Sequence, residues 1–287
     1  MPELIQLFVN GLVAGTILAV PAIGFTAIYA VLRFPNFAVA AHATIGAFAG
    51  YVANTAFGLP AWASVAVAFV VAGAAGVAND TLVLRPLRPA GALTTAIAAV
   101  ALNIALENVV RFVFGNDLRG YDLPIQRDWQ VATLRIGPQQ VQNLVIAVVA
   151  MVALFLFLAG TRTGKAMRAV ADNPTLASIK GINPEAVARL VNFVGMGLAG
   201  LGGMLLGLDT SIDPLTGFRV ILSVFAAAVV GGLGSIPGAV VGALTIGVAE
   251  EMSLVALAPA YRSAVGFFAI LLVLTLRPRG ILGERAY

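Results

Sequence analysis

Long stretches without charge constrain this sequence more than any other feature. Residues 34–79 contain no Asp, Glu, Lys or Arg, and about 20 apolar residues suffice to cross the hydrocarbon core of a bilayer. This stretch therefore predicts two membrane spans, with a turn near Gly58-Leu59-Pro60. Only 10% of the chain is charged and 60% is hydrophobic, whereas soluble domains carry about 25% charged residues. The composition excludes a soluble enzyme, and the absence of alternating polarity excludes an outer-membrane barrel.

Further charge-free stretches predict the remaining spans. The last long one, Val220–Ala249, exceeds one crossing and is interrupted by Gly231–Gly238, so it predicts two segments. We expect one domain over residues 1–287, an all-α polytopic bundle of about 8 to 10 transmembrane helices, some of them interrupted. The predicted spans are Leu4–Leu32, Phe34–Asn79 (two), Ala90–Phe114, Pro138–Gly160, Leu190–Leu208, Val220–Ala249 (two) and Ser263–Leu276.

The distribution of charge predicts the orientation. The chain has a net charge of +4, and the loops on one side hold +7 while those on the other hold −3. Because Lys and Arg concentrate in cytoplasmic loops, the N-terminus is predicted to be periplasmic and the C-terminus cytoplasmic. The basic balance thus needs no nucleic-acid partner. Two long loops follow: a periplasmic one at 115–137 and a cytoplasmic one at 161–189, which contains helix-forming residues interrupted by two Asn-Pro pairs.

Catalytic and metal-binding residues are not predicted. The chain has no cysteine and a single histidine, His42, which cannot build a metal site alone. The segment GTRTGKA at Gly160 has three residues between its glycines and an alanine after the lysine, so it lacks the pattern of a phosphate-binding loop. We therefore expect no cofactor on this chain.

Polar residues within the spans are the candidates for a substrate path. Glu107 is the leading one, because ionisable groups are costly in lipid, although an ion pair with Arg111 four residues later is an equal alternative. Interrupted helices at Pro35-Asn36-Phe37 and at Gly231–Gly238 are a second pointer, since freed backbone groups require water or protein beside them. An ordinary tight loop at the inner surface is an equal alternative at each. Each of the other polar residues could instead make an interhelical hydrogen bond. The candidates are Thr26, Asn36, His42, Thr44, Thr94, Thr95, Asn103 and Glu107, with Asn192 as a further polar position.

Close helix packing is predicted by glycines four residues apart. Small residues at this spacing let helix backbones approach, and packing within the chain is favoured over a subunit interface. The pairs are Gly11 with Gly15, Gly46 with Gly50, Gly203 with Gly207, and Gly234 with Gly238 and Gly242.

Several segments resemble a known family. The stretches RAVADNPTLASIKGIN (168–183), AVVGGLGSIPGAVVGALTIGVAEE (228–251) and RPRGILG (277–283), with weaker matches at NFA, GAF, RPLR and FGND, are similar to permease subunits of branched-chain amino-acid ABC importers. The resemblance implies a bacterial inner-membrane permease that works with a second, identical or homologous permease, two cytoplasmic ATP-binding subunits and a periplasmic solute-binding protein. ATP would be bound by those partner subunits.

The resemblance also implies roles for two short segments. The residues expected to contact the ATPase are Arg168, Asp172, Asn173, Pro174, Lys180 and Gly181. Relatives that carry branched-chain amino acids or urea usually follow NFA with His, Gly and an acid, whereas this chain has Val39, Ala40 and Ala41. This departure suggests a different or less polar solute, such as an aromatic acid or a hydrophobic amino acid. The alternatives are an ion-coupled secondary transporter, for which Glu107 is the candidate carboxylate, and a structural subunit of a larger membrane complex.

Overall fold

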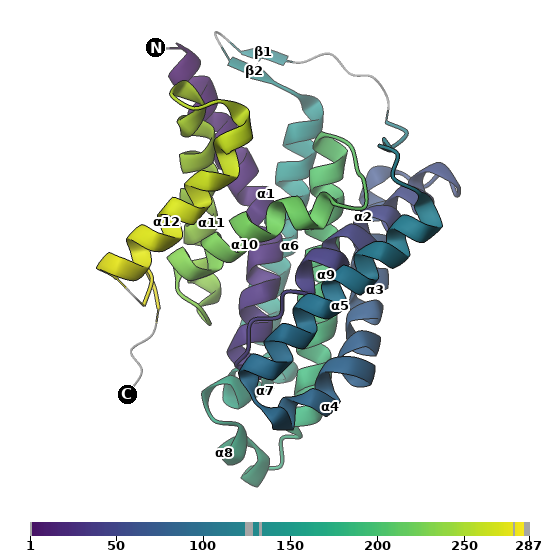
Figure 1. The fold of residues 1–287 in the computed structure, drawn as a ribbon, viewed down its shortest axis with the longest axis vertical. Helices are drawn as coiled ribbons and strands as arrows, with labels where there is room; N and C mark the ends of the chain where they lie inside the picture. Colours follow the sequence, from purple (N-terminus) through teal and green to yellow (C-terminus); the bar gives the residue numbers. More distant parts are fainter. Residues whose placement is uncertain (1, 124–128, 132–133, 278, 284–287) are drawn as a thin grey trace.

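The computed structural model describes residues 2–123, 129–131, 134–277 and 279–283, so part of the predicted outer loop lies outside the described residues. The described chain is a bundle of helices with one short hairpin (Figure 1). The longer helices are α1 (Pro2–Leu32), α2 (Val39–Thr55), α3 (Ala61–Asn79), α5 (Ala92–Phe114), α6 (Pro138–Gly160), α9 (Pro184–Asp209), α10 (Thr216–Gly231), α11 (Ile236–Met252) and α12 (Arg262–Leu276). Shorter elements are η1 (Asp80–Leu84), α4 (Arg85–Leu87), η2 (Arg88–Ala90), β1 (Trp129–Val131), β2 (Leu134–Ile136), α7 (Arg162–Asp172), α8 (Pro174–Ile179), η3 (Ser253–Val255) and η4 (Pro259–Tyr261).

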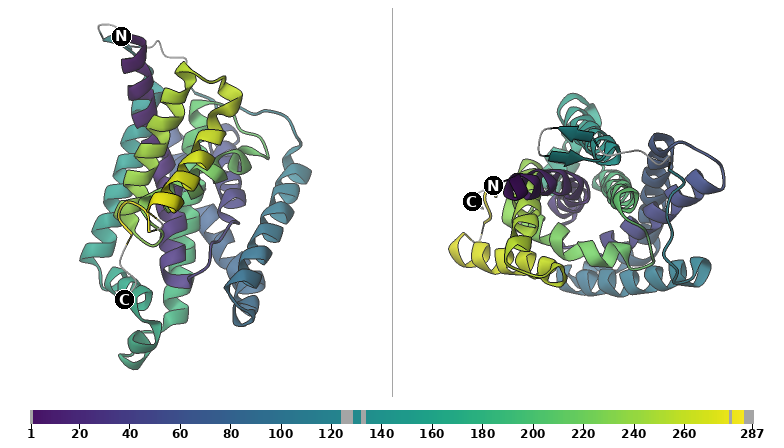
Figure 2. Two further views of the ribbon diagram at one scale, coloured as in Figure 1. Left: turned by 60° about the vertical axis from the view of Figure 1, so that its left-hand side comes forward. Right: turned by 90° about the horizontal axis from the view of Figure 1, so that it is seen from above.

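Two helices form the centre of the bundle, α1 and α9. Both are apolar around most of their circumference, a pattern typical of helices that are enclosed by others. Helix α1 packs against α9 and α11, and α9 packs against α2 and α3 (Figures 1 and 2). Viewed from above, α5, α10 and α12 lie along one side of the molecule (Figure 2). Six helices of the described chain are long and apolar enough to cross a membrane, which confirms the all-α polytopic prediction.

Glycines set the distances between these helices. A Cβ on Gly46 of α2 would lie 2.2 Å from the Cα of Gly200 on α9, and a Cβ on Gly203 would lie 2.0 Å from the carbonyl oxygen of Ala43. Gly11 and Gly15 of α1 meet the backbone of α11 in the same way. The prediction that the spaced glycines pack within the chain is therefore confirmed for these helices. Gly234 differs, because no atom lies within 4 Å of the Cβ position and its φ is +92°.

Both predicted interruptions are present. Helix α1 ends at Leu32 and α2 begins at Val39, so the Pro35-Asn36-Phe37 segment separates them. Helix α10 ends at Gly231 and α11 begins at Ile236. Helices α2 and α10 have 17 and 16 residues, and at 1.5 Å per residue each is shorter than the roughly 30 Å core of a bilayer.

The two ends of the bundle are fastened by different contacts. At one end the guanidinium of Arg33 donates to the carbonyl of Ala171 at 2.6 Å, and Arg85 pairs with Glu185 at 2.9 Å, which ties α7 and the start of α9 to the bundle. At the other end Gln6 exchanges two hydrogen bonds with the backbone of Arg135 in β2. These contacts place the N-terminus and the β hairpin opposite α7 and α8 (Figure 1).

One predicted boundary is wrong. Helix α9 begins at Pro184 rather than at Leu190, so the inner loop is shorter than predicted. The side chain of Asn183 accepts from the amides of Glu185 and Ala186 at 3.0 and 3.3 Å, and proline fits the first helical position, so the helix starts there. A charged first turn hid this start from a search for apolar stretches.

Candidate functional site

Four of the predicted path residues meet around the start of α2. The side-chain oxygen of Asn36 accepts from the amide of Ala38 at 3.2 Å, and that of Asn103, on α5, accepts from the amide of Ala41 at 2.7 Å. The Nδ1 atom of His42 lies 2.7 Å from the carbonyl oxygen of Ala38. All three side chains are buried. The structure therefore brings these residues together, and they satisfy backbone groups freed by the interruption before α2.

The fourth residue, Thr44, joins α2 to α10. Its hydroxyl oxygen accepts from the amide of Gly217 at 2.9 Å, and a Cβ on Gly217 would lie 1.8 Å from the carbonyl oxygen of Ala40. The N-terminal turns of α2 and α10 consequently touch inside the bundle. A contact this close requires glycine at position 217.

Some buried polar atoms on α1, on α9 and in the segment before α2 have no hydrogen-bond partner in the described part of the chain. They are Thr26 Oγ1, Asn36 Nδ2 and Asn192 Oδ1. Because a buried polar atom without a partner costs about 1–3 kcal/mol, these atoms are suited to meet water or a polar solute. The rings of Phe25, Phe37 and Phe225 lie 5.6–6.4 Å apart, centroid to centroid, and form an aromatic cluster between α1, α10 and the segment before α2.

Three further predicted path residues, Thr94, Thr95 and Glu107, lie on α5 away from the start of α2. Thr94 is exposed and donates to the carbonyl of Ala90, while Thr95 is buried and donates to that of Gly91 at 3.0 Å. Glu107 pairs with Arg111 at 2.9 Å, with 13% of the Glu107 side chain exposed. The i,i+4 ion pair considered for Glu107 is therefore present.

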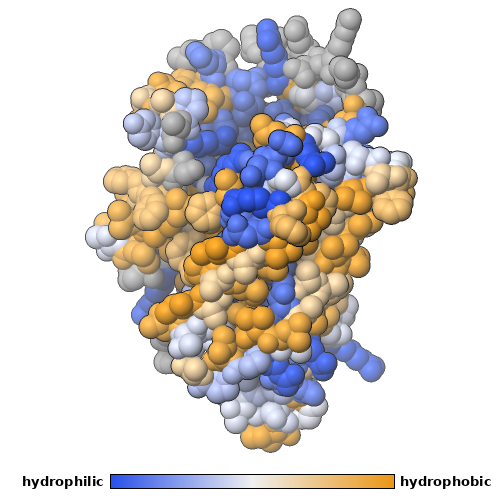
Figure 3. Space-filling view, turned by 45° about the vertical axis from the view of Figure 1, so that its right-hand side comes forward, coloured by the Kyte–Doolittle hydropathy of each residue, from blue (hydrophilic) through white to orange (hydrophobic). Residues whose placement is uncertain are grey.

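Sequence reasoning missed a charged pair at the start of α10. Residues 210–215 turn back into the bundle after α9, and in this turn the carboxylate of Asp213 pairs with the guanidinium of Arg219, whose side chain is 55% exposed. On the face of the molecule drawn in Figure 3, hydrophilic side chains gather in the upper part, above and within a hydrophobic band. The signal in the sequence was the motif Asp213-Pro214 followed by Arg219 within the approach to an apolar segment.

The outer loop fastens this turn in place. Arg119 and Ile212 form a β-bridge, with backbone distances of 2.8 and 2.9 Å, and the hydroxyl of Tyr121 donates to the carbonyl of Ala47 at 2.9 Å. Burial raises the pKa of the Tyr121 phenol, so it remains a protonated donor. The loop after α5 thus contacts both α2 and the segment before α10 and holds them together.

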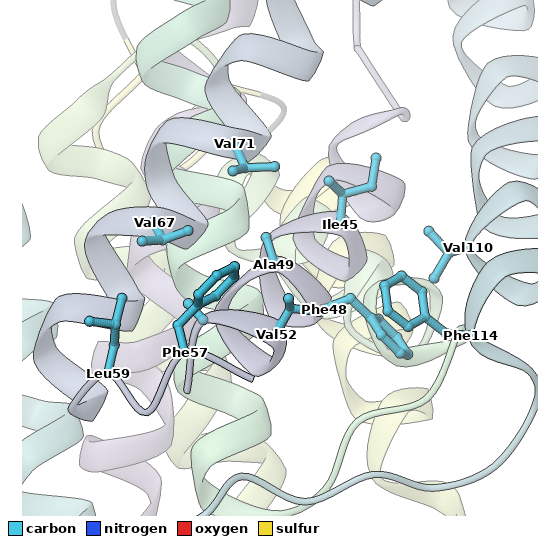
Figure 4. A pocket seen from close by; sticks show the side chains of 11 residues that line it. Ile45, Phe48, Ala49, Val52, Phe57, Leu59, Val67, Val71, Val110 and Phe114 are labelled. Atoms are coloured by element: carbon cyan, nitrogen blue, oxygen red, sulfur yellow. The ribbon is translucent and has the colours of Figure 1, made fainter. Parts of the chain in front are cut away.

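A cavity of about 490 Å³ opens between α2, α3 and α5 (Figure 4). Its lining is apolar and includes Phe48, Phe57 and Phe114. Such a lining accommodates hydrocarbon but has no group that orients the charged ends of a polar solute. The cavity is therefore separate from the polar features described above.

The predicted ATPase-contacting residues share one exposed surface. Arg168 and Asp172 lie on α7, Asn173 and Pro174 at the α7–α8 junction, and Lys180 and Gly181 after α8; all are exposed. Two apolar side chains that the prediction omitted are exposed beside them, Leu176 at 54% and Ile179 at 76%. We name the surface formed by α7, α8 and residues 180–181 the inner platform, and Figure 1 shows α7 and α8 at one end of the bundle. Exposed leucine and isoleucine next to charged residues are typical of a protein contact.

A helical bundle with membrane-length spans and interrupted helices is the architecture of a multi-pass membrane transport protein. A sequence model of the family described as "Branched-chain amino acid transport system / permease component" matches residues 7–275. The chain belongs to this family.

Relatives match along nearly the whole chain. The high-affinity branched-chain amino acid transport system permease protein LivH of Escherichia coli is 34% identical over 98% of this chain and 96% of its own length. The corresponding BraD of Pseudomonas aeruginosa is 32% identical over 99% and 98%, and a probable LivH of Methanocaldococcus jannaschii is 30% identical over 96% and 91%. Among solved structures, PsaBC from Streptococcus pneumoniae in complex with Fab has a TM-score of 0.49 at 15% identity, covering 94% and 91% of the two chains.

The family assignment defines the kind of subunit. The chain is the permease subunit of an ABC importer, a multi-pass protein of the inner membrane that works in a complex with ATPase and binding-protein partners. Its relatives are transport subunits, so the chain is a transporter component rather than an enzyme.

Proposed function

We propose that this permease imports branched-chain or related hydrophobic amino acids. The observation that carries the proposal is the similarity, over 98% of the chain, to permeases named for branched-chain amino acid transport. A periplasmic binding protein delivers the solute, a second permease, identical or homologous, completes the pore, and two cytoplasmic subunits hydrolyse ATP. The permease itself binds no cofactor. Its N-terminus is periplasmic and its C-terminus cytoplasmic, as the charge bias of the loops indicates.

The inner platform is the contact for the ATPase subunits in this proposal. The platform lies at the end of the bundle, where a soluble partner can reach it. It offers that partner two exposed cations, Arg168 and Lys180, and two exposed apolar side chains, Leu176 and Ile179. The bond from Arg33 to Ala171 would transmit that movement to the end of α1. Movement at the platform therefore has a direct connection to the centre of the bundle.

Transport by alternating access follows from the interrupted helices. The junction of α2 and α10 is held by one amide-to-hydroxyl bond and by backbone contact at Gly217. Rocking the two helices against each other would expose the polar atoms of Thr26, Asn36 and Asn192 first to one side and then to the other.

The Val39-Ala40-Ala41 segment supports the proposal that the solute is hydrophobic. All three side chains are buried, and the amide of Ala41 is already bonded to Asn103. Relatives with a histidine and an acid here would place polar groups at this junction, whereas this chain offers methyl groups. Restoring the family's residues at these positions should broaden the solute range toward more polar compounds, and an unchanged range would remove this hypothesis.

The test of the function is uptake by the complete complex. The permease is tagged, purified from its native membrane in mild detergent with its associated subunits, identified by mass spectrometry and reconstituted in liposomes with its binding protein. We expect two ATPase chains, a second permease, and leucine uptake that requires ATP and survives collapse of the proton gradient. Uptake that follows the gradient would instead support ion coupling through Glu107, and a complex without uptake would indicate a structural subunit.

A further inference from the structure

The turn before α10 places charged side chains below the outer end of the bundle. Gly217 is bonded to Thr44, which lies 11 residues before the outer end of α2, about 16 Å along the helix axis at 1.5 Å per residue. The first turns of α10 therefore lie within the level of the membrane-spanning helices, and Arg219 lies in the first turns of α10.

An arginine at this level cannot face lipid. Its side chain is 55% exposed, and a guanidinium in hydrocarbon is costly even when it is paired. Arg219 therefore lies toward water or protein rather than toward lipid.

The two oxygens of Asp213 have different tasks. Oδ1 accepts from the amide of Leu215 at 3.1 Å and from the hydroxyl of Thr216 at 3.2 Å, and so fixes the turn that begins α10. Oδ2 accepts from Arg219 alone among the described contacts. One oxygen is thus structural, while the other and the guanidinium can change partners without unravelling the turn.

The chemistry of the pair matches one class of ligand. A guanidinium binds a carboxylate through two parallel hydrogen bonds, and a carboxylate oxygen accepts from an ammonium group. A molecule that carries both groups on one carbon can insert between Arg219 and Oδ2 of Asp213. Beside them Leu215 is 39% exposed and Phe218 58% exposed, which provides apolar contact for a hydrophobic side chain.

We propose that Asp213 and Arg219 form an outer ion-pair site that receives the zwitterionic backbone of a hydrophobic amino acid, with Arg219 on the carboxylate and Asp213 on the ammonium. The site rests on the proposed function, since it assumes that the solute is an amino acid. The solute occupies this site after it leaves the binding protein and before it reaches the junction of α2 and α10. The ion pair closes again when the solute moves on.

Direct binding tests the site. Radiolabelled leucine is titrated onto the permease–ATPase complex in nanodiscs without the binding protein, and the wild type is compared with Arg219→Gln and Asp213→Asn. We expect each variant to weaken leucine binding at least tenfold, which is about 1.4 kcal/mol. Asn at position 213 still accepts from Leu215 and Thr216, so a purely structural role for Asp213 predicts no such loss. Arg135→Gln, on the exposed hairpin, removes the same charge from the outer side and should change nothing.

Two analogues assign the individual contacts. Isoamylamine lacks the carboxylate, so its weak binding should be indifferent to Arg219→Gln; 4-methylpentanoate lacks the ammonium and should be indifferent to Asp213→Asn. Arg219→Lys keeps the charge without the planar fork and should lose part of the affinity.

The outcomes separate this site from the proposed function. If the wild-type complex with its binding protein imports leucine, but binding by the permease is absent or is the same in wild type and both variants, the outer ion-pair site is refuted and the function stands. If the wild type imports no amino acid, the proposed function has failed. Variants that are monodisperse and reach the wild-type Tm exclude misfolding as the cause of lost binding.

Discussion

The contact between Gly46 and Gly200 permits a quantitative test of the packing. In Gly46→Ala the new methyl group would lie 2.2 Å from the Cα of Gly200 and 2.5 Å from its carbonyl carbon and oxygen, whereas carbon atoms in good contact are about 3.5–4.0 Å apart. All three atoms belong to the backbone of α9, so no side chain can rotate away. Helices α2 and α9 would have to separate locally by about 1.5 Å.

The cost of this separation follows from overpacking. Inserting a methyl group into a close-packed core costs typically about 1–3 kcal/mol. For a domain of this size a loss of 1 kcal/mol lowers Tm by about 2–4 °C, so we expect a fall of about 2–12 °C. The measurement is the Tm of the purified permease complex, followed by size-exclusion chromatography after heating.

A matched alanine variant controls for composition. Gly160, the last residue of α6, has no atom within 4 Å of its Cβ position, so Gly160→Ala should leave Tm unchanged or raise it slightly. The reasoning is refuted if Gly46→Ala has the same Tm as Gly160→Ala. That result would mean that α2 and α9 are not held at the distance described here.

Three further substitutions test other contacts. The carboxylate of Asp80 is 2% exposed and accepts from Arg88 at 2.5 and 2.6 Å, so Arg88→Gln leaves it without its partner. We expect the free energy of unfolding to fall by about 3–5 kcal/mol in Arg88→Gln and to be partly restored in the double variant Asp80→Asn/Arg88→Gln. A double variant no more stable than Arg88→Gln would contradict the pairing. Asn103→Leu removes the acceptor of the Ala41 amide and should lower the free energy of unfolding by about 1–3 kcal/mol. The control Thr94→Val, on the exposed face of α5, should leave stability unchanged, and equal Tm values for the two variants would refute the role of Asn103. Asp172→Asn, on the inner platform, should reduce uptake per ATP hydrolysed at normal abundance and Tm, and full uptake in this variant would count against the platform as the ATPase contact.

The spans were predictable because the bilayer imposes a length and an apolar composition on each crossing. The segment 138–160 matches α6 at both ends, and the turn at 58–60 separates α2 from α3 as predicted. The boundary at Leu190 failed because the first turn of α9 is charged and lies outside the apolar stretch, where the capping side chain of Asn183 determines the start. Hydrophobicity indicates which segments can cross the membrane, whereas hydrogen bonding at the first turn determines the residue at which a helix begins.

The candidate path was only partly predictable. Composition singled out Asn36, His42, Thr44 and Asn103, but their shared location depends on contacts between residues as far apart as Thr44 and Gly217. Thr94 and Glu107 passed the same composition test and lie elsewhere on α5, where local bonds satisfy them. A polar residue in a span has the same appearance in the sequence whether it caps a neighbouring helix, pairs along its own helix or meets a solute.

The sequence by itself determined the class of protein, the approximate limits of most spans, the charge asymmetry and the family, because each depends on local composition or on motifs contiguous in the chain. The tertiary structure decided that the starts of α2 and α10 touch, how α10 begins inside the bundle, and that Asp213 and Arg219 pair. Those features arise from the close approach of Gly217 to Ala40 and of Arg119 to Ile212, contacts between distant segments whose geometry local residue patterns do not encode.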